Sequence, residues 1–260
     1  MSMRFVLSLL LTLLPGAAWS AMVEEPVRHT LDGVAMESVL VYDDSGPASR
    51  PSVLMVPNWL GVTPAARVMA RQIAGRDYVV LLADVYGVDV RPKNPNEAKQ
   101  AASTLRADRA LLRARANNAM DAMLAAGKKV GADAGKSAAI GFCFGGGTVL
   151  ELARSGRELK GVVSFHGNLD TPNPKDAGNI KAAVLVLHGA DDPVVPDAQL
   201  AAFQTEMKAV PGIDWQLVSF GGAVHSFTDP DANTPGRSQY HERTAQRAFA
   251  LMRRFFGEIF

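Results

Sequence analysis

The sequence predicts a single α/β domain built on a doubly wound, mostly parallel sheet. Short apolar runs typical of buried strands alternate with longer segments of helical spacing through most of the 260 residues. Polar loops follow several of these runs, and no repeat, low-complexity segment or linker divides the chain. With 48% hydrophobic and 20% charged residues, the composition is that of a globular protein with a packed core.

The first twenty residues are predicted to be a signal peptide rather than part of the fold. Arg4 supplies a positive charge, residues 5–14 form an apolar run, and small residues precede a predicted cleavage site near Ser20 and Ala21. The run is too short to span a bilayer. We therefore expect residues 21–260 to form a mature domain that is exported, periplasmic or secreted, without stable membrane insertion.

The amino-terminal half is expected to supply three strands and two or three helices. Thr63 is a good N-cap, and Pro64 after it suits a first helical residue. A second region of helical spacing begins near Pro95 and meets a plausible stop at Gly127, so it forms one helix or two. The predicted strands are 36–42, 52–57 and 78–83, and the predicted helices lie within 65–74 and 97–126.

The central feature of the chain is the turn from Gly141 to Gly145. An apolar run leads into Gly141, and Phe142, Cys143 and Phe144 separate it from a run of glycines that opens a helix ending near residue 155. The pattern matches the strand-to-helix turn that presents the nucleophile in the α/β-hydrolase fold, with cysteine as the nucleophile. A Cβ at either flanking glycine would push the turn away from its neighbours.

Cys143 is the single cysteine of the chain, so it cannot form an internal disulfide. A sulfur at the first turn of a helix lies at the positive end of the helix dipole, which favours the thiolate. The alternative is a buried structural cysteine, because a free cysteine packs well in a core. An isolated thiol in an oxidising compartment is more naturally a reactive group, although an intermolecular bridge stays open.

The carboxyl-terminal half is expected to supply the base and the acid. Two carboxylates, Asp191 and Asp192, follow one predicted strand, and His225 lies in a glycine-rich loop after another. Nucleophile, acid and histidine then occur in the chain order used by α/β-hydrolases, but spacing does not decide between the two aspartates. The predicted strands are 161–165, 183–188 and 214–220, and the predicted helices are 196–209 and 239–256.

The other histidines and the charges offer no competing site. We expect His29 and His241 on the surface, and His166 and His188 at strand ends that orient loops. No close spacing of His, Asp and Glu suggests a metal site. A formal net charge of +1 without a block of like charge disfavours nucleic acid as a partner. A solvated helix face is expected for the arginines near the middle of the chain, namely Arg106, Arg109, Arg113 and Arg115.

These motifs together resemble the dienelactone hydrolase family over roughly residues 34–256. The family patterns G-[FY]-C-x-G-G, G-x-x-D-x-x-x-P and H-x-F begin here at Gly141, Gly189 and His225. The resemblance implies a small ester or lactone as substrate, an acyl-enzyme on the cysteine and no metal or cofactor. It also implies Asp192 as the acid.

The resemblance further implies an oxyanion hole and two departures from the family pattern. The oxyanion hole would be formed by the backbone N–H groups of Phe144 and Trp59. Asn58 stands where the family has a glutamate that helps to ionise the cysteine. The carboxylate-binding arginines of the family are also missing near Tyr86 and after the histidine. We therefore expect Asn58, Tyr86 and Arg91 to contact substrate, with Arg91 as a possible substitute for a lost arginine.

Two functions follow from the sequence. The first is an exported hydrolase of a small ester or lactone, with a larger acyl or peptide ester as a variant of the same chemistry. The second is a non-catalytic binding protein on the same fold, which the asparagine at position 58 motivates. The oligomeric state and the natural substrate are left open by the sequence.

Overall fold

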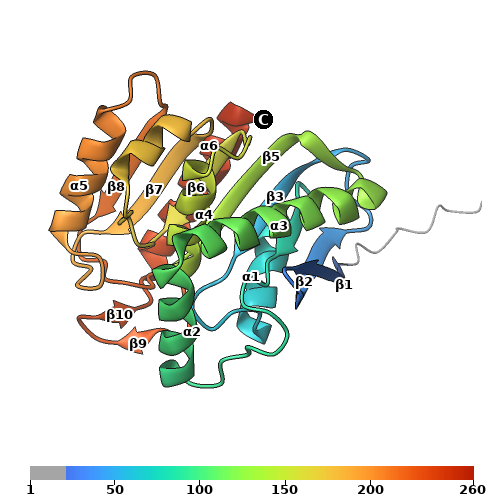
Figure 1. The fold of residues 1–260 in the computed structure, drawn as a ribbon, viewed down its shortest axis with the longest axis horizontal. Helices are drawn as coiled ribbons and strands as arrows, with labels where there is room; N and C mark the ends of the chain where they lie inside the picture. The colour runs from blue at the N-terminus through green and yellow to red at the C-terminus, as the bar shows by residue number, and fades with distance from the viewer. Residues whose placement is uncertain (1–21) are drawn as a thin grey trace, which may run out of the picture.

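The computed structural model describes residues 22–260, so the predicted signal peptide lies outside the described residues. One eight-stranded sheet forms the centre of the molecule (Figure 1). Its strands are β1 (Met22–Leu31), β2 (Val34–Asp43), β3 (Arg50–Val56), β4 (Val79–Leu82), β5 (Ala132–Phe142), β6 (Gly161–Phe165), β7 (Ala183–Gly189) and β8 (Trp215–Phe220).

The strands lie in the order β1-β2-β4-β3-β5-β6-β7-β8. Strands β3 to β8 run parallel to one another, and only β2 of this sheet runs against its neighbours, β1 and β4. The predicted mostly parallel α/β sheet in a single domain is therefore confirmed. Because the strands are parallel, the loops that follow them gather at one edge, where ligands bind in such sheets.

Helices cover both faces of the sheet (Figure 1). Alternate residues of β3 show how the two cores are divided. Leu54 and Val56 pack into the core that includes α3 and α4, while Val53 and Met55 pack into the core that includes α1 and α6. The helices are α1 (Pro64–Ala74), α2 (Pro95–Ala107), α3 (Arg109–Gly127), α4 (Phe144–Arg154), α5 (Asp197–Lys208) and α6 (Glu242–Ile259).

Short elements complete the chain. They are the 3₁₀ helices η1 (Lys128–Val130) and η2 (Pro174–Asn179) and the two-residue strands β9 (Asn233–Thr234) and β10 (Ser238–Gln239). The small pair β9 and β10 follows the loop that carries His225, and the backbone N–H of Gln239 donates to the carbonyl of His225 at 2.9 Å. The pair thereby tethers the histidine loop.

The helix ends follow the capping signals in the sequence. Thr63 Oγ1 accepts the N–H of Ala66 at 3.1 Å, which confirms the predicted start of α1. The region that allowed one helix or two contains two, and Asp108 is the junction. Its side chain accepts the N–H of Leu111 at 2.9 Å and so begins α3 directly after α2 ends.

The structure contains one strand that was not predicted, and one prediction about the surface is wrong. Strand β1 was not predicted, because an edge strand containing Pro26 and paired charges lacks the apolar run of a buried strand. The four central arginines do not form a solvated face. Arg106 and Arg109 pair with Asp170, Arg113 pairs with Glu151 and Asp176, and Arg115 donates to the carbonyls of Val85 and Tyr86. Helix α3 packs against α4 and the sheet, so these guanidinium groups find protein partners.

Candidate active site

The turn between β5 and α4 holds Cys143 in a strained conformation. Its φ of 53° and ψ of −117° place a non-glycine residue in a sparsely populated region. A Cβ on Gly141 would lie 2.0 Å from the carbonyl oxygen of Gly145, and a Cβ on Gly145 would lie 2.1 Å from that of Val56. The predicted need for glycine at both positions is confirmed, and Cys143 is half-buried on this sharp turn.

The loops after β7 and β8 bring an acid and an imidazole to the sulfur. His225 Nε2 lies 3.0 Å from Cys143 Sγ, and His225 Nδ1 lies 2.8 Å from Asp192 Oδ2. The other carboxylate oxygen of Asp192 accepts the backbone N–H groups of Val194 at 2.7 Å and Val195 at 3.2 Å. Of the two candidate aspartates, the structure thus places Asp192 against the histidine.

The charges around His225 favour a protonated ring. Burial by itself lowers the pKa of this imidazole, because the charged form loses hydration. The negative charge of a Cys143 thiolate and the hydrogen bond to Asp192 outweigh burial and raise the pKa to about 10. At neutral pH the group can therefore hold an imidazolium between a carboxylate and the sulfur, as cysteine nucleophiles require.

The two residues expected to form an oxyanion hole lie on braced backbone. Phe144 is the first residue of α4, so its N–H has no acceptor within the helix. Trp59 lies in a turn after β3 in which Asn58 Oδ1 accepts the N–H of Leu60 at 3.0 Å. The hydroxyl of Tyr86 donates to the carbonyl of Trp59 at 3.0 Å, and its ring stacks on that of Phe144 at 5.3 Å between centroids.

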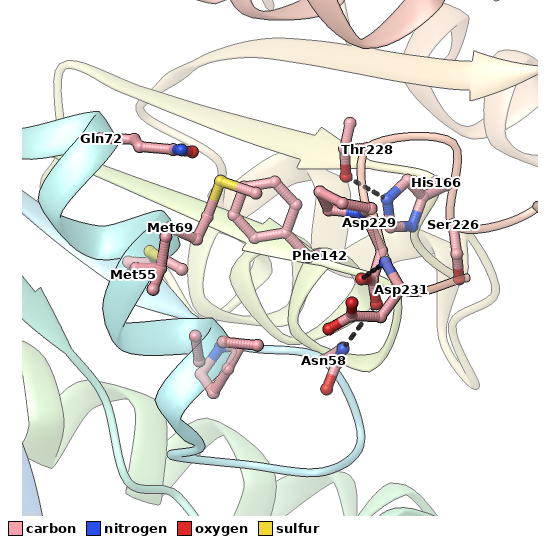
Figure 2. Close-up of a pocket in the computed structure, with 15 residues that line it drawn as sticks. Met55, Asn58, Met69, Gln72, Phe142, His166, Ser226, Thr228, Asp229 and Asp231 are labelled. Atoms are coloured by element: carbon pink, nitrogen blue, oxygen red, sulfur yellow. Dashed lines mark hydrogen bonds between the residues drawn. The ribbon is translucent and has the colours of Figure 1, made fainter. Parts of the chain in front are cut away.

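A pocket of about 270 Å³ lies beside this group, between α1 and the loop after His225 (Figure 2). Phe142, which precedes Cys143, and Ser226, which follows His225, both line it. Met55, Val68 and Met69 supply apolar walls, and Asn58 and Asp229 stand on the side of the histidine loop. The pocket can accept a small organic group attached to a substrate carbonyl.

The comparisons with known proteins agree with this geometry. The model of the dienelactone hydrolase family matches residues 37–260. The chain belongs to the dienelactone hydrolase family. A solved structure named m3DLH is 38% identical, with a TM-score of 0.86 over 92% of this chain and 99% of that one. A dienelactone hydrolase-like promiscuous phosphotriesterase, P91, from metagenomic libraries is 37% identical, with a TM-score of 0.84 over the same shares.

A curated relative extends the comparison at lower similarity. A putative carboxymethylenebutenolidase of Salmonella typhimurium is 25% identical over 263 residues, which cover 88% of this chain and 90% of the relative. Together with the family match, this similarity shows that the chain is a hydrolase of the dienelactone hydrolase type. The structural similarity to m3DLH and P91 confirms the α/β-hydrolase fold predicted from the sequence.

The three residues predicted to contact substrate, Asn58, Tyr86 and Arg91, have different surroundings. Asn58 lines the pocket, and its amide nitrogen lies 3.5 Å from Asp229 Oδ2. Tyr86 is buried, and burial raises the pKa of its hydroxyl, so it braces the oxyanion residues as a neutral group. Arg91 pairs with the buried Asp84 at 2.7 Å and donates to the carbonyl of Gly87. Arg91 also lines a second pocket together with Tyr86, so its contact with substrate stays a prediction.

His166 makes more contacts near Cys143 than its sequence position indicated. His166 has a φ of 39°, and its Nδ1 lies 3.2 Å from the backbone nitrogen of Cys143. Its Nε2 lies 2.8 Å from Thr228 Oγ1, and its ring meets that of His225 edge-on at 5.2 Å. Burial holds the pKa of His166 well below the usual range, so the ring is neutral at physiological pH.

The geometry assigns the hydrogens of His166. Since Nδ1 accepts the backbone N–H of Cys143, the ring proton sits on Nε2 and is donated to Thr228. His166 thus ties the strained turn to the loop after His225, as its predicted orienting role implied. A histidine directly after a buried strand was the available signal, but its partners come from loops far apart in the sequence.

Two structural features are absent from residues 22–260. No group of three or more His, Cys, Asp or Glu side chains in that range is placed to hold a metal ion. In the same part of the chain, no helix is long and apolar enough to cross a membrane.

Proposed function

We propose that this protein hydrolyses a small carboxylic ester or lactone through an acyl-enzyme on Cys143. The observation that carries the proposal is the chain of contacts from Asp192 through His225 to Sγ, with 2.8 Å and 3.0 Å separations. Sγ is the nucleophile, His225 carries the proton, and Asp192 fixes the ring so that Nε2 faces the sulfur.

The first half of the reaction forms a thioester. The Sγ thiolate attacks the carbonyl carbon, and the electron pair of the C=O bond moves to the oxygen, which the N–H groups of Phe144 and Trp59 stabilise. When the C=O bond re-forms, the ester C–O bond breaks. The leaving alkoxide takes the proton from Nε2 of His225, which leaves a neutral imidazole.

The second half returns the enzyme. Neutral His225 accepts a proton from water as the water oxygen attacks the thioester carbon. Collapse of this second tetrahedral species breaks the C–S bond, releases the carboxylic acid and restores the thiolate beside the imidazolium. For a lactone, both products are one molecule, because the leaving alkoxide stays attached to the acyl group.

We also propose that the protein is exported and acts after removal of residues 1–20. The support is the charged start, the short apolar run and the small residues before Ala21 in the sequence. Expression of the full chain followed by amino-terminal sequencing of protein from the periplasm or medium tests this. A mature start near Ala21 supports export, and an intact Met1 in the cytoplasm contradicts it.

A neutral phosphotriester is a second candidate substrate class. The support is the similarity to P91, which is described as a promiscuous phosphotriesterase. The thiolate would displace an aryloxide from phosphorus, and water would then release the phosphodiester from sulfur. Paraoxon hydrolysis by wild type and Cys143→Ala tests this class.

The deciding experiment is hydrolysis of p-nitrophenyl acetate by residues 21–260. Wild type should turn over, and Cys143→Ala should lose that turnover while keeping its melting temperature. Unchanged turnover in Cys143→Ala would sink the mechanism. Absence of turnover on acyl, lactone and phosphotriester panels, with Cys143 labelled by iodoacetamide no faster than a free thiol, would favour a binding protein on this fold.

A further inference from the structure

The pocket beside Cys143 has an acidic wall without a matching cation. Its ionisable lining groups are Asp229, Asp231 and the neutral His166, and no Lys or Arg is among the described residues that line it (Figure 2). Within residues 22–260, neither aspartate has a Lys or Arg nitrogen within 4.0 Å. The pocket therefore carries negative charge, and its lining includes Phe142 and Ser226, the chain neighbours of Cys143 and His225.

Asp229 is the more enclosed of the two carboxylates. One of its oxygens accepts the backbone N–H of Asp231 at 3.0 Å, and the other lies 3.5 Å from the amide nitrogen of Asn58. Partial burial raises the pKa of this carboxyl. Its charge is thus incompletely compensated within the protein, and a cation entering the pocket would gain the missing attraction.

The position of Asp229 links this charge to the reaction. Only three residues separate it from His225, and Thr228, directly before it, holds His166 under the nucleophile turn. Asn58 connects the other side, since it precedes Trp59 on the expected oxyanion turn. Asp229 therefore stands on the loop that carries His225 and contacts the loop that carries Trp59, so a substrate bound at Cys143 can extend toward it.

We propose that Asp229 makes this hydrolase charge-selective, so that esters carrying a quaternary ammonium or other cationic group are preferred over esters carrying a carboxylate. This proposal rests on the proposed ester hydrolysis at Cys143. The apolar wall of Met55, Val68 and Met69 suits the methyl groups of such a cation, and the carboxylate supplies its counter-charge. An anionic substrate meets repulsion at the same place.

The test compares esters of one shape and different charge. The probes are p-nitrophenyl esters of 4-(trimethylammonio)butyrate, of its neutral isostere 5,5-dimethylhexanoate, and of glutarate, which carries a free carboxylate. A second pair, butyrylcholine and 3,3-dimethylbutyl butyrate, places the charge on the alcohol. We expect wild type to favour the cation over its isostere by about tenfold in kcat/KM in at least one pair, and to disfavour glutarate.

Three variants locate the cause. Asp229→Asn keeps the shape and the contact to Asp231, and it should bring the cation-to-isostere ratio to about one. Asp229→Arg should invert the order, so that the glutarate ester becomes the best of the three acyl probes. Asp214→Asn is the matched control, since this exposed carboxylate lies just before β8, at the end of the strand away from the site.

The outcomes separate this proposal from the proposed function. Loss of the preference in Asp229→Asn but not in Asp214→Asn supports it. If wild type and Asp229→Asn have equal cation-to-isostere ratios and activity still requires Cys143, charge selection by Asp229 is overturned but the proposed reaction is not. Activity that survives Cys143→Ala would overturn the reaction first. If Asp229→Asn fails to fold, Asp231→Asn gives the second test, with a smaller loss of preference expected because this carboxylate is exposed.

Discussion

The two ends of α4 carry two buried polar clusters with different purposes. At its amino end, the half-buried Cys143 contacts His225, and the line of hydrogen bonds begins at its sulfur. At its carboxyl end, Arg154 is 1% exposed and pairs with Glu151 at 2.9 Å and Glu206 at 2.8 Å. One helix of eleven residues thus carries a reactive cluster at one end and a closed one at the other.

The closed cluster is held together by several ion pairs. Arg154 also donates to the carbonyl of Leu169 at 3.0 Å, and Arg113 pairs with Glu151 and with Asp176 at 2.8 Å and 2.7 Å. The reactive cluster differs in three respects. Cys143 has a strained φ, the pKa of His225 is raised, and the sulfur of Cys143 is the proposed nucleophile. The comparison teaches that burial of charge marks a functional site only where a reactive atom is left accessible.

The largest expected effect is at the reactive end. Cys143→Ala should lower kcat/KM for p-nitrophenyl acetate by at least ~10³-fold, because no other nucleophile replaces Sγ. Its melting temperature should change little, since the side chain is small and partly exposed. A stopped assay and a thermal melt on the same sample check both statements. A large drop in melting temperature would mean that the reactive end also holds the fold together.

The opposite pattern is expected at the closed end. Arg154→Met should lower the free energy of unfolding by about 3–5 kcal/mol, because it leaves the buried Glu206 without a counter-charge and leaves Glu151 with Arg113 alone. Urea titration checks this, with kcat/KM of the folded fraction expected within about threefold of wild type. Arg254→Met is the matched control, since its pair with Glu258 is solvent-exposed and should leave stability unchanged.

Removing the acid should move the pH profile. The protonated form of His225 is needed to release the leaving group, so kcat/KM should fall as pH rises through the raised value of about 10. Asp192→Asn removes one cause of the raised pKa, so this fall should occur at lower pH, with the maximum reduced by about 10²-fold. An unchanged basic limb in Asp192→Asn would contradict the assigned role of the carboxylate.

A smaller effect is expected at His166. His166→Phe removes the donor to Thr228 and one of the two acceptors of the Cys143 N–H, the other being the carbonyl of Phe165, so kcat should fall by about tenfold with KM little changed. His166→Gln offers an amide with both functions and should recover part of the loss. Equal kcat values for the Phe and Gln variants would show that His166 only fills space.

The smallest effect is expected at Asn58. Asn58→Glu would place a second carboxylate about where the amide now faces Asp229, so the single change should alter the p-nitrophenyl acetate rate by no more than about threefold. Asn58→Glu combined with Asp229→Arg restores opposite charges and should be faster than the single variant. A single variant as fast as the double would show that Asp229 does not restrain position 58.

Much of this arrangement was predictable because it depends on local signals. The sequence shows the glycines around Cys143, the Thr63 cap and the order of Cys143, Asp192 and His225. The buried strands can be recognised as apolar runs. From the sequence, only the resemblance to the family motif favoured Asp192 over Asp191. The structure then showed His225 against Asp192.

The remainder depends on contacts between distant segments. Asn58 and Asp229 are 171 residues apart, and His166 meets loops on either side of it. The ion pair between Arg91 and Asp84 was not predicted, because it depends on the path of a single loop. Strand β1 escaped prediction because its pairing with β2, rather than its own composition, makes it a strand.

The most direct test of the central claim is to trap the acyl-enzyme. Wild type mixed with p-nitrophenyl butyrate and quenched in acid within milliseconds should gain the mass of one butyryl group, and peptide mapping should place it on Cys143. His225→Gln should gain the group more slowly and retain it longer, because water then lacks its base. A butyryl group on another residue, or turnover without any covalent species in wild type, would contradict the account.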